Sequence, residues 1–366
     1  MTENLESILN QTPTELQRWL VERKHPPYRA KQVYQWIYQR RADSFAAMTD
    51  LSKPLRDELE RSFHLDLPPV AARQHAEKED TEKILLRLAD GEGIECVRMP
   101  RYESKIQTDP RSGAIHNKGA EAGSYTLCLS TQAGCLFACR FCASGQRGWN
   151  RNLTAGEMAA QVLTFLREGR EVSRLVFMGT GEPLHNLAEV QRAIEILCAQ
   201  EGLAWSPRRI TLSTVGLVPE IYRIGREGWM VKLAVSLHAT TDAQRAELMP
   251  LARGYQLDQL LHALHDYQAR NKRRITFEYL MLDSVNDSHA DADRLARLCA
   301  GLTCHVNLIP FNPITRVPYR PTPAPQVERF RLWLRKQGID VTVRFSRGRT
   351  IDAACGQLRL RQDESS

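Results

Sequence analysis

Three cysteines in one short stretch could bind a metal centre. Cys135, Cys139 and Cys142 have the spacing C-x3-C-x2-C, with Phe141 just before the last cysteine. A structural zinc site takes four closed ligands, and an ordinary iron–sulfur cluster takes four cysteines. Three thiolates around a four-iron cluster would leave one iron open to a substrate. The alternative is a zinc loop that recruits a distant histidine, since no histidine lies inside the stretch.

The composition limits the partners and the location that the chain can have. Its 366 residues are 42% hydrophobic, enough for one large barrel-type domain with a small accessory one. A formal net charge of +7 favours an anionic partner such as nucleic acid. No apolar run approaches the ~18 residues of a membrane span, and the acidic N-terminus lacks a signal-peptide pattern. Nine cysteines, three of them clustered, fit a reducing cytoplasm better than a secreted disulfide scaffold.

Residues 1–66 have the pattern of amphipathic helices. Leu16 and Leu20 share one face of the first predicted helix, and Pro26-Pro27 separates it from the next. The module is basic, through Arg18, Arg23, Lys24, Arg29, Lys31, Arg40 and Arg41. These side chains form either a solvated charged surface or an RNA-binding face. We interpret the module as a helical accessory RNA-binding domain, and we expect it to contact phosphate together with the basic tail around Arg344, Arg347 and Arg349.

Two shorter segments follow this module. Residues 67–102 predict a small β extension, in which Asp90-Gly91 marks a hairpin-type turn. Residues 103–124 are polar, contain three glycines and one proline, and predict a flexible loop.

Residues 125–350 predict an α/β domain, because strand-like runs alternate with amphipathic stretches. The expected strands are 125–130, 174–178, 209–214, 230–237, 274–281, 303–309 and 341–345. Thr154 and Glu157 form a capping-box pattern before one of the helices. About six units are too few for an eight-unit barrel, so we expect a partial, open (β/α)6 barrel. Residues 351–366 form a separate C-terminal segment.

Polar or glycine-rich motifs follow most of the expected strands. They are the three-cysteine stretch, Gly179–Pro183, Ser213–Gly216, Ser236–His238 and Asn307–Asn312. In parallel α/β folds the chemistry gathers at the carboxyl ends of the strands. Each motif alone is also typical of an ordinary tight turn, but together with the cysteines they predict a site at one rim.

Several of these motifs resemble the RlmN/Cfr family of radical S-adenosylmethionine RNA adenine methyltransferases. The resemblance runs from the N-terminal module nearly to the end of the chain. It is carried by Leu127–Cys135, the cysteine stretch itself, Asn150–Leu153, Phe177–Pro183, Ser236–Ala239 and Ile351–Cys355. It implies a partial radical-SAM barrel with a [4Fe–4S] cluster held by the three cysteines, and two S-adenosylmethionine molecules per turnover. The cofactor-binding residues that it implies are Gly181, Glu182, Ser213, Ser236, Leu237, His238 and Asn312.

The resemblance also assigns roles to two outlying cysteines. A hydrogen-bearing ring carbon of adenine is not nucleophilic, so it cannot attack a methyl sulfonium directly. The family solution implies that Cys355 is methylated first, and that a 5′-deoxyadenosyl radical then removes hydrogen from its methyl group. The methylene radical adds to adenine, and Cys128 releases the covalent adduct by forming a transient disulfide with Cys355. Glu95 takes the place of the family's proton acceptor; without the resemblance it predicts an exposed strand glutamate, Cys128 a buried strand residue and Cys355 a loop thiol.

The implied reaction is methylation at adenine C2. The implied substrates are 23S rRNA near the peptidyl transferase centre and tRNA beside the anticodon, with a reductant such as flavodoxin as electron donor. Pro183 favours this branch over the C8-directed branch that confers ribosomal antibiotic resistance. Two features depart from the family pattern, a longer 103–124 segment and Thr180 where methionine is common. We expect a cytoplasmic monomer that does not bind membranes.

Two other classes of function stay open on the sequence. A radical enzyme could act on a protein or small molecule, although Cys355 would have no clear part in its reaction. A non-catalytic, metal-stabilised RNA-binding module would contain zinc in place of iron.

Overall fold

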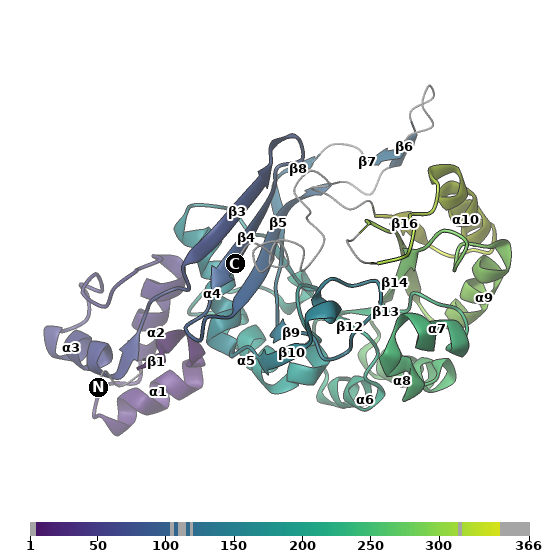
Figure 1. Cartoon of the computed structure of the whole chain (residues 1–366). Coiled ribbons are helices and arrows are strands. Elements are labelled where there is room, and N and C mark those ends of the chain that lie inside the picture. Colours follow the sequence, from purple (N-terminus) through teal and green to yellow (C-terminus); the bar gives the residue numbers. More distant parts are fainter. Residues whose placement is uncertain (1–4, 103–105, 109–114, 118–119, 314–316, 345–366) are drawn as a thin grey trace.

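One ten-stranded sheet positions nearly every candidate residue. The structure, a computed structural model, describes residues 5–102, 106–108, 115–117, 120–313 and 317–344. The strand order of the sheet is β16-β15-β14-β13-β12-β11-β8-β5-β4-β3. The order runs from one edge strand to the other without closing, as expected for an open barrel (Figure 1).

Seven parallel strands form the barrel, and each neighbours the next along the chain. They are β8 (Ala120–Cys128), β11 (Arg174–Phe177), β12 (Ile210–Thr214), β13 (Lys232–Ser236), β14 (Ile275–Met281), β15 (Cys304–Pro310) and β16 (Val341–Val343). The helices between them are α4 (Ala155–Arg167), α5 (Leu187–Cys198), α6 (Val218–Glu227), α7 (Asp242–Leu248), α8 (Leu257–Asn271), α9 (His289–Cys299) and α10 (Ala324–Lys336). Six strand–helix units followed by a seventh strand confirm the predicted partial (β/α)6 barrel.

The barrel helices pack their apolar faces against the sheet. Helix α4 begins at the predicted capping box, in which the Thr154 hydroxyl accepts from the Glu157 amide and the Glu157 carboxylate accepts from the Thr154 amide. Its buried residues include Met158, Val162 and Leu166. Burial of such stripes against the strands drives the assembly of this layer.

Three antiparallel strands extend the barrel sheet at β8. They are β3 (Val70–Ala76), β4 (Thr81–Arg87) and β5 (Gly93–Tyr102), and β5 pairs antiparallel with β8. The predicted hairpin turn is present between β4 and β5, where the Leu88 amide donates to the Glu92 carbonyl over 2.7 Å. The extension and the barrel are therefore one continuous hydrogen-bonded sheet.

The segment 103–124 differs from the loop that we predicted. Strands β6 (Ile106–Thr108) and β7 (Ile115–Asn117) pair antiparallel, and β8 already begins at Ala120. The Tyr102 and Ala120 positions pair in register, so the ladder of β5 and β8 reaches into the segment. Backbone hydrogen bonds in a ladder need no apolar face, which explains why a polar composition concealed these strands.

The N-terminal module packs on the outer helices of the barrel. It contains α1 (Pro13–Glu22), α2 (Arg29–Tyr34), a π-helical turn at Gln35–Gln39 and α3 (Lys53–Ser62). Two short strands, β1 (Glu6–Ser7) and β2 (Phe63–His64), pair in parallel and join its two ends. Asn10 fastens it to the barrel, because its side chain accepts from the Gly156 amide at 2.7 Å and its carbonyl accepts from Arg192 at 2.6 Å.

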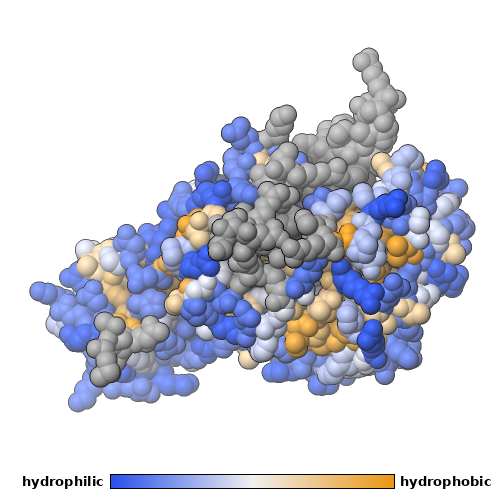
Figure 2. Space-filling model, in the orientation of Figure 1, coloured by the Kyte–Doolittle hydropathy of each residue, from blue (hydrophilic) through white to orange (hydrophobic). Residues whose placement is uncertain are grey.

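The exterior of the protein is mostly hydrophilic in the view of Figure 2, with an apolar patch on the barrel. Among the described residues, no helix combines the length and the apolar character that crossing a bilayer requires.

Candidate active site

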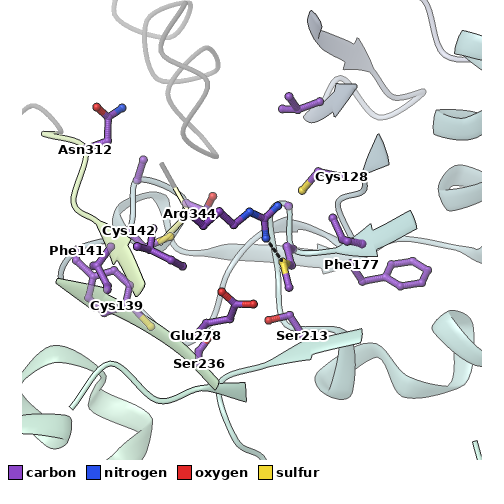
Figure 3. Close-up of a pocket in the computed structure, with 18 of the residues that line it drawn as sticks. Cys128, Cys139, Phe141, Cys142, Phe177, Ser213, Ser236, Glu278, Asn312 and Arg344 are labelled. Carbon is purple, nitrogen blue, oxygen red and sulfur yellow. Dashed lines mark hydrogen bonds between the residues drawn. The ribbon is translucent and has the colours of Figure 1, made fainter. Parts of the chain in front are cut away.

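A cavity of about 520 Å³ opens at the rim where the parallel strands end. Figure 3 shows that side chains from many strands converge on it. Candidate residues that line it are Cys128, Cys135, Cys139, Cys142, Gly181, Glu182, Ser213, Ser236, His238 and Asn312. The predicted rim therefore corresponds to one shared space.

The cysteine stretch forms a loop closed at its base by a short strand pair. Strand β9 (Gln132–Gly134) pairs antiparallel with β10 (Trp149–Asn152), directly beside Cys135. Gly134 has a φ of 82°, and a Cβ there would lie 2.1 Å from the Gly148 carbonyl oxygen. Only glycine fits this crossing, so the base of the loop is defined by its backbone.

The donor set of the loop suits an iron–sulfur cluster in its chemistry. Burial raises the pKa of Cys135 to about 12 and that of Cys139 well above its ordinary value, and the charges of the loop cysteines also raise both. Buried thiolates need a compensating positive charge, which bound iron supplies. Within the described ranges, no three histidine, cysteine or acidic side chains are gathered at metal-binding distance. The fit therefore rests on three thiols that share one cavity.

The glycine-rich loop after β11 presents a buried carboxylate. The Glu182 oxygens accept from the Leu184 amide at 3.0 Å and the Val215 amide at 2.8 Å. Burial raises the pKa of Glu182 to about 7. Gly181 has a φ of 106°, and a Cβ there would lie 2.6 Å from the Gln132 side chain. The loop thus packs closely against β9, and its glycines line the cavity with backbone atoms.

Serines and a histidine line the cavity from β12 and β13. Ser213 and Ser236 point into it, and Ser236 pairs in register with Glu278 on β14. His238 has a φ of 56°, and its Nδ1 accepts from the Leu280 amide at 3.0 Å. That bond assigns the proton of the neutral ring to Nε2. Burial lowers the pKa of His238 to about 3, so the ring is neutral.

Leu237 is the one expected cofactor contact whose side chain does not line the cavity. It is fully buried in the main hydrophobic core, and its amide donates to the Glu278 carbonyl at 3.0 Å. Side chains alternate along an extended chain, so a residue between two inward-facing positions turns outward. Any contact between Leu237 and a ligand would run through its backbone.

Cys128 and Glu95 share a small pocket, which Val97, Gly179 and Thr180 also line. Of the two, Glu95 lines only this small pocket. Cys128 also lines the main cavity, and Figure 3 shows it across the view from Cys139. Glu95 is only 3% exposed, which corrects the default expectation of an exposed strand glutamate. Cys355 lies outside the described residues.

Three charged residues of the cavity were not identified as site residues from the sequence, namely Arg101, Glu278 and Arg344. Glu278 is buried on β14, where its Oε1 accepts from Asn307 at 3.0 Å and its Oε2 has no hydrogen-bond partner. Arg344 lines the cavity with its guanidinium 3.9 Å from the sulfurs of Met99 and Met178, and its contact with RNA phosphate stays a prediction. Alternation along β14 could have placed Glu278, since Ser236 and Glu278 share a face. Arg347 and Arg349 lie outside the described residues.

Comparisons with known proteins identify relatives of the chain by sequence. The sequence profile of the ribosomal RNA large subunit methyltransferase N-terminal domain matches residues 6–65, and that of the radical SAM superfamily matches residues 129–296. A dual-specificity RNA methyltransferase RlmN from Solidesulfovibrio magneticus is 42% identical, over 98% of this chain and 97% of the relative. The corresponding protein of Campylobacter fetus is 41% identical, over 92% of this chain and 94% of its own.

A solved structure matches nearly the whole fold. The crystal structure of a radical SAM methyltransferase from Sphaerobacter thermophilus superimposes with a TM-score of 0.86 at 42% identity, covering 96% of this chain and 98% of that one. The likeness extends over the N-terminal module, the β extension and the barrel together. The chain therefore belongs to the RlmN family of the radical S-adenosylmethionine superfamily.

Proposed function

We propose that this protein methylates C2 of adenine in RNA, with 23S rRNA and tRNA as its substrates. The observation that carries the proposal is the cavity, which both the cysteine loop and Cys128 line, with Glu95 in a small pocket that it shares with Cys128. The relatives named as dual-specificity RNA methyltransferases support two RNA substrates. We further infer that a small reductant such as flavodoxin supplies electrons and that the protein acts as a monomer in the cytoplasm.

Residues of the rim would hold the cofactors. Cys135, Cys139 and Cys142 would bind a [4Fe–4S] cluster, which supplies the electron that cleaves S-adenosylmethionine. The Glu182 carboxylate, the backbone at Gly181 and the side chains of Ser213, Ser236, His238 and Asn312 would bind S-adenosylmethionine. An acceptor-rich wall of this kind suits the ammonium and hydroxyl groups of that ligand.

Two cysteines would carry the methyl group and release the product. Cys355 would take the methyl group, a 5′-deoxyadenosyl radical would remove one hydrogen atom from it, and the resulting methylene carbon would become bonded to C2 of adenine. The adduct radical would then lose one electron, for which the oxidised cluster would be the acceptor, and Glu95 would accept the C2 proton. The Cys128 thiolate then attacks the Cys355 sulfur, and the carbon–sulfur bond breaks with its electron pair on the former methylene carbon, which takes up a proton to become the methyl group.

The deciding experiment is anaerobic reconstitution with iron, sulfide, S-adenosylmethionine and an rRNA fragment, followed by nucleoside mass spectrometry. We expect 2-methyladenosine. If 8-methyladenosine is the only product, the C2 assignment is wrong and the C8-directed reaction replaces it. A zinc protein that binds RNA without methylating it would instead identify the non-catalytic module.

Cysteine variants test the methyl-carrier route in the same assay. We expect Cys355→Ala to abolish methylated nucleoside, because no other thiol would accept the methyl group. We expect Cys128→Ala to retain a covalent protein–RNA adduct that survives a denaturing gel. Full turnover by Cys355→Ala would refute the route and favour a radical reaction on a different substrate.

A further inference from the structure

A buried ion pair stands next to the candidate proton acceptor. The Lys83 ammonium on β4 lies 2.7 Å from Oε2 of Glu95 on β5, and the two side chains are 0% and 3% exposed. Lysine is almost never fully buried unless it is paired. The position of this pair therefore requires a physical explanation.

The sheet register places the pair on the same face as Cys128. Lys83 pairs in register with Val97, and Val97 pairs in register with Cys128 on the other side of β5. Glu95 is two residues from Val97, so its side chain emerges on that same face. Glu95 and Cys128 line the same small pocket. The Lys83 ammonium therefore contacts the carboxylate of Glu95, which shares a pocket with Cys128, the cysteine proposed to release the product.

Stability alone is a weak reason for this arrangement. Removing two charges from water costs about as much as their attraction returns, and apolar residues of similar size often serve as well. The neighbouring Glu82, on the opposite face of β4, forms the commoner kind of ion pair, in which the cation is partly exposed to solvent. It forms an ion pair with Arg73, which is 34% exposed and also reaches Glu168. Glu82 thus has a solvated partner, whereas the partner of Glu95 is wholly enclosed.

We propose that Lys83 is a positioning residue that holds the Glu95 carboxylate directed toward the adduct at the moment of proton transfer. The inference rests on the proposed function and adds a residue to it. In the step concerned, which follows the loss of one electron from the adduct radical, the C2–H bond breaks, the proton moves to Glu95 and the electron pair returns to the adenine ring. The contact of 2.7 Å with the Lys83 ammonium fixes the orientation of the carboxylate that receives this proton.

The test compares adduct formation with product release in single-turnover reactions of the reconstituted enzyme with an rRNA fragment. We expect Lys83→Met and Lys83→Gln to form the covalent protein–RNA adduct in wild-type amount and to release 2-methyladenosine roughly 100-fold more slowly, the usual worth of a general base. Lys83→Arg keeps the charge and should release product at a rate nearest to wild type. Denaturing gels quantify the adduct, and nucleoside mass spectrometry quantifies the product.

Arg73→Met is the matched control, because it removes a cation from an ion pair on the opposite face of β4. It should lower the melting temperature without changing the ratio of adduct to product. Release at the wild-type rate by a folded Lys83→Met or Lys83→Gln variant would overturn the inference. So would failure of both variants to fold while Lys83→Arg folds, since the pair would then be purely structural. Absence of adduct and product in the wild type would instead refute the proposed function itself.

Discussion

At the scale of single residues, burial sets the protonation states of the groups that line the cavity. It lowers the pKa of His238 and raises that of Glu278, so both side chains favour their neutral forms. The neutral imidazole has one donor and one acceptor, and the acceptor is already bound to the Leu280 amide. The neutral His238 ring can therefore donate a hydrogen bond to a ligand without adding charge.

Glu278 should make the stability of the protein depend on pH. Burial raises its pKa above the ordinary value of 4.5, although Arg344, Asn307 and His305 act in the opposite direction. The folded state then binds a proton that the unfolded chain has already lost, so this contribution to stability is lost as pH rises from 4.5 through the raised pKa. A tenfold difference in proton affinity between the folded and unfolded states corresponds to about 1.4 kcal/mol.

Glu278→Gln removes the titrating group and keeps an acceptor for Asn307. We expect the variant to gain in melting temperature relative to wild type as pH is raised above the ordinary carboxyl pKa of 4.5, because the wild-type carboxyl then loses its proton inside the fold. Thermal unfolding followed by circular dichroism at a series of pH values measures the difference. Two curves that stay parallel at every pH would contradict it.

The cysteine loop should account for all iron in the protein. We expect anaerobically reconstituted wild type to contain about four irons, and Cys139→Ala to contain less than about one, because two thiolates cannot retain the cluster. Cys299→Ala is the control, since Cys299 is buried in the main core and away from the cavity. Elemental analysis decides the question, and zinc in place of iron would restore the zinc-loop alternative.

At the scale of elements, the turns that follow the strands build the site by close backbone contact. The loop after β11 lies against the end of β8, where the Gly179 amide donates to the Leu129 carbonyl at 2.9 Å. A Cβ at Gly179 would lie 2.6 Å from that same carbonyl oxygen. Side chains could not be added here without separating β8 from β11, so these glycines determine the shape of the cavity wall.

Gly181→Ala should therefore damage both stability and ligand binding. The left-handed backbone costs about 1–2 kcal/mol for a residue with a Cβ, and the clash with Gln132 adds roughly 1–3 kcal/mol. Gly228→Ala provides the control, because Gly228 has a φ of 70° and a Cβ there would have nothing within 4 Å. We expect only Gly181→Ala to weaken S-adenosylmethionine binding in calorimetric titrations. Equal effects of the two substitutions would show that the close contact is unimportant.

At the scale of the whole molecule, a net charge of +7 is combined with a basic module beside the barrel. Several of its cations are engaged inside the module. Arg23 stacks on Trp19 at 4.2 Å and lies near Glu58, and Arg40 stacks on Trp36 at 4.1 Å. Arg18, Lys24 and Lys31 are exposed. The exposed cations are the candidates for contact with RNA phosphate.

RNA binding should weaken as salt concentration rises, because phosphate contacts release counterions. We expect Arg18→Ala combined with Lys24→Ala to reduce the slope of log affinity against log salt by about 2, since each substitution removes one cation from the phosphate backbone. Fluorescence anisotropy with a labelled rRNA fragment measures the slope. A matched double variant at Arg335 and Lys336, in the last turn of α10, should leave it unchanged. Affinity that does not depend on salt would contradict this account.

The parallel strands and their rim were predictable because local pattern and topology agree there. Apolar runs indicated the strands, and parallel pairing requires the carboxyl ends of these strands to meet at one edge of the sheet. The burial of Glu95 was not predictable, because it depends on Lys83 from a neighbouring strand and both faces of β4 are buried. The side chain of Leu237 points into the core and that of Arg344 into the cavity. These directions depend on the strand register and on where β16 ends, and the sequence alone specifies neither the register nor that end.

The junction at β8 has a mechanical consequence. This strand belongs both to the parallel barrel and to the antiparallel extension, with no linker between them. Groups on either side of it cannot move apart without breaking a continuous ladder of hydrogen bonds, so no hinge exists at this point for domain motion. The distance between β5, which contains Glu95, and β11, which leads into the glycine-rich loop, is therefore set by one shared strand.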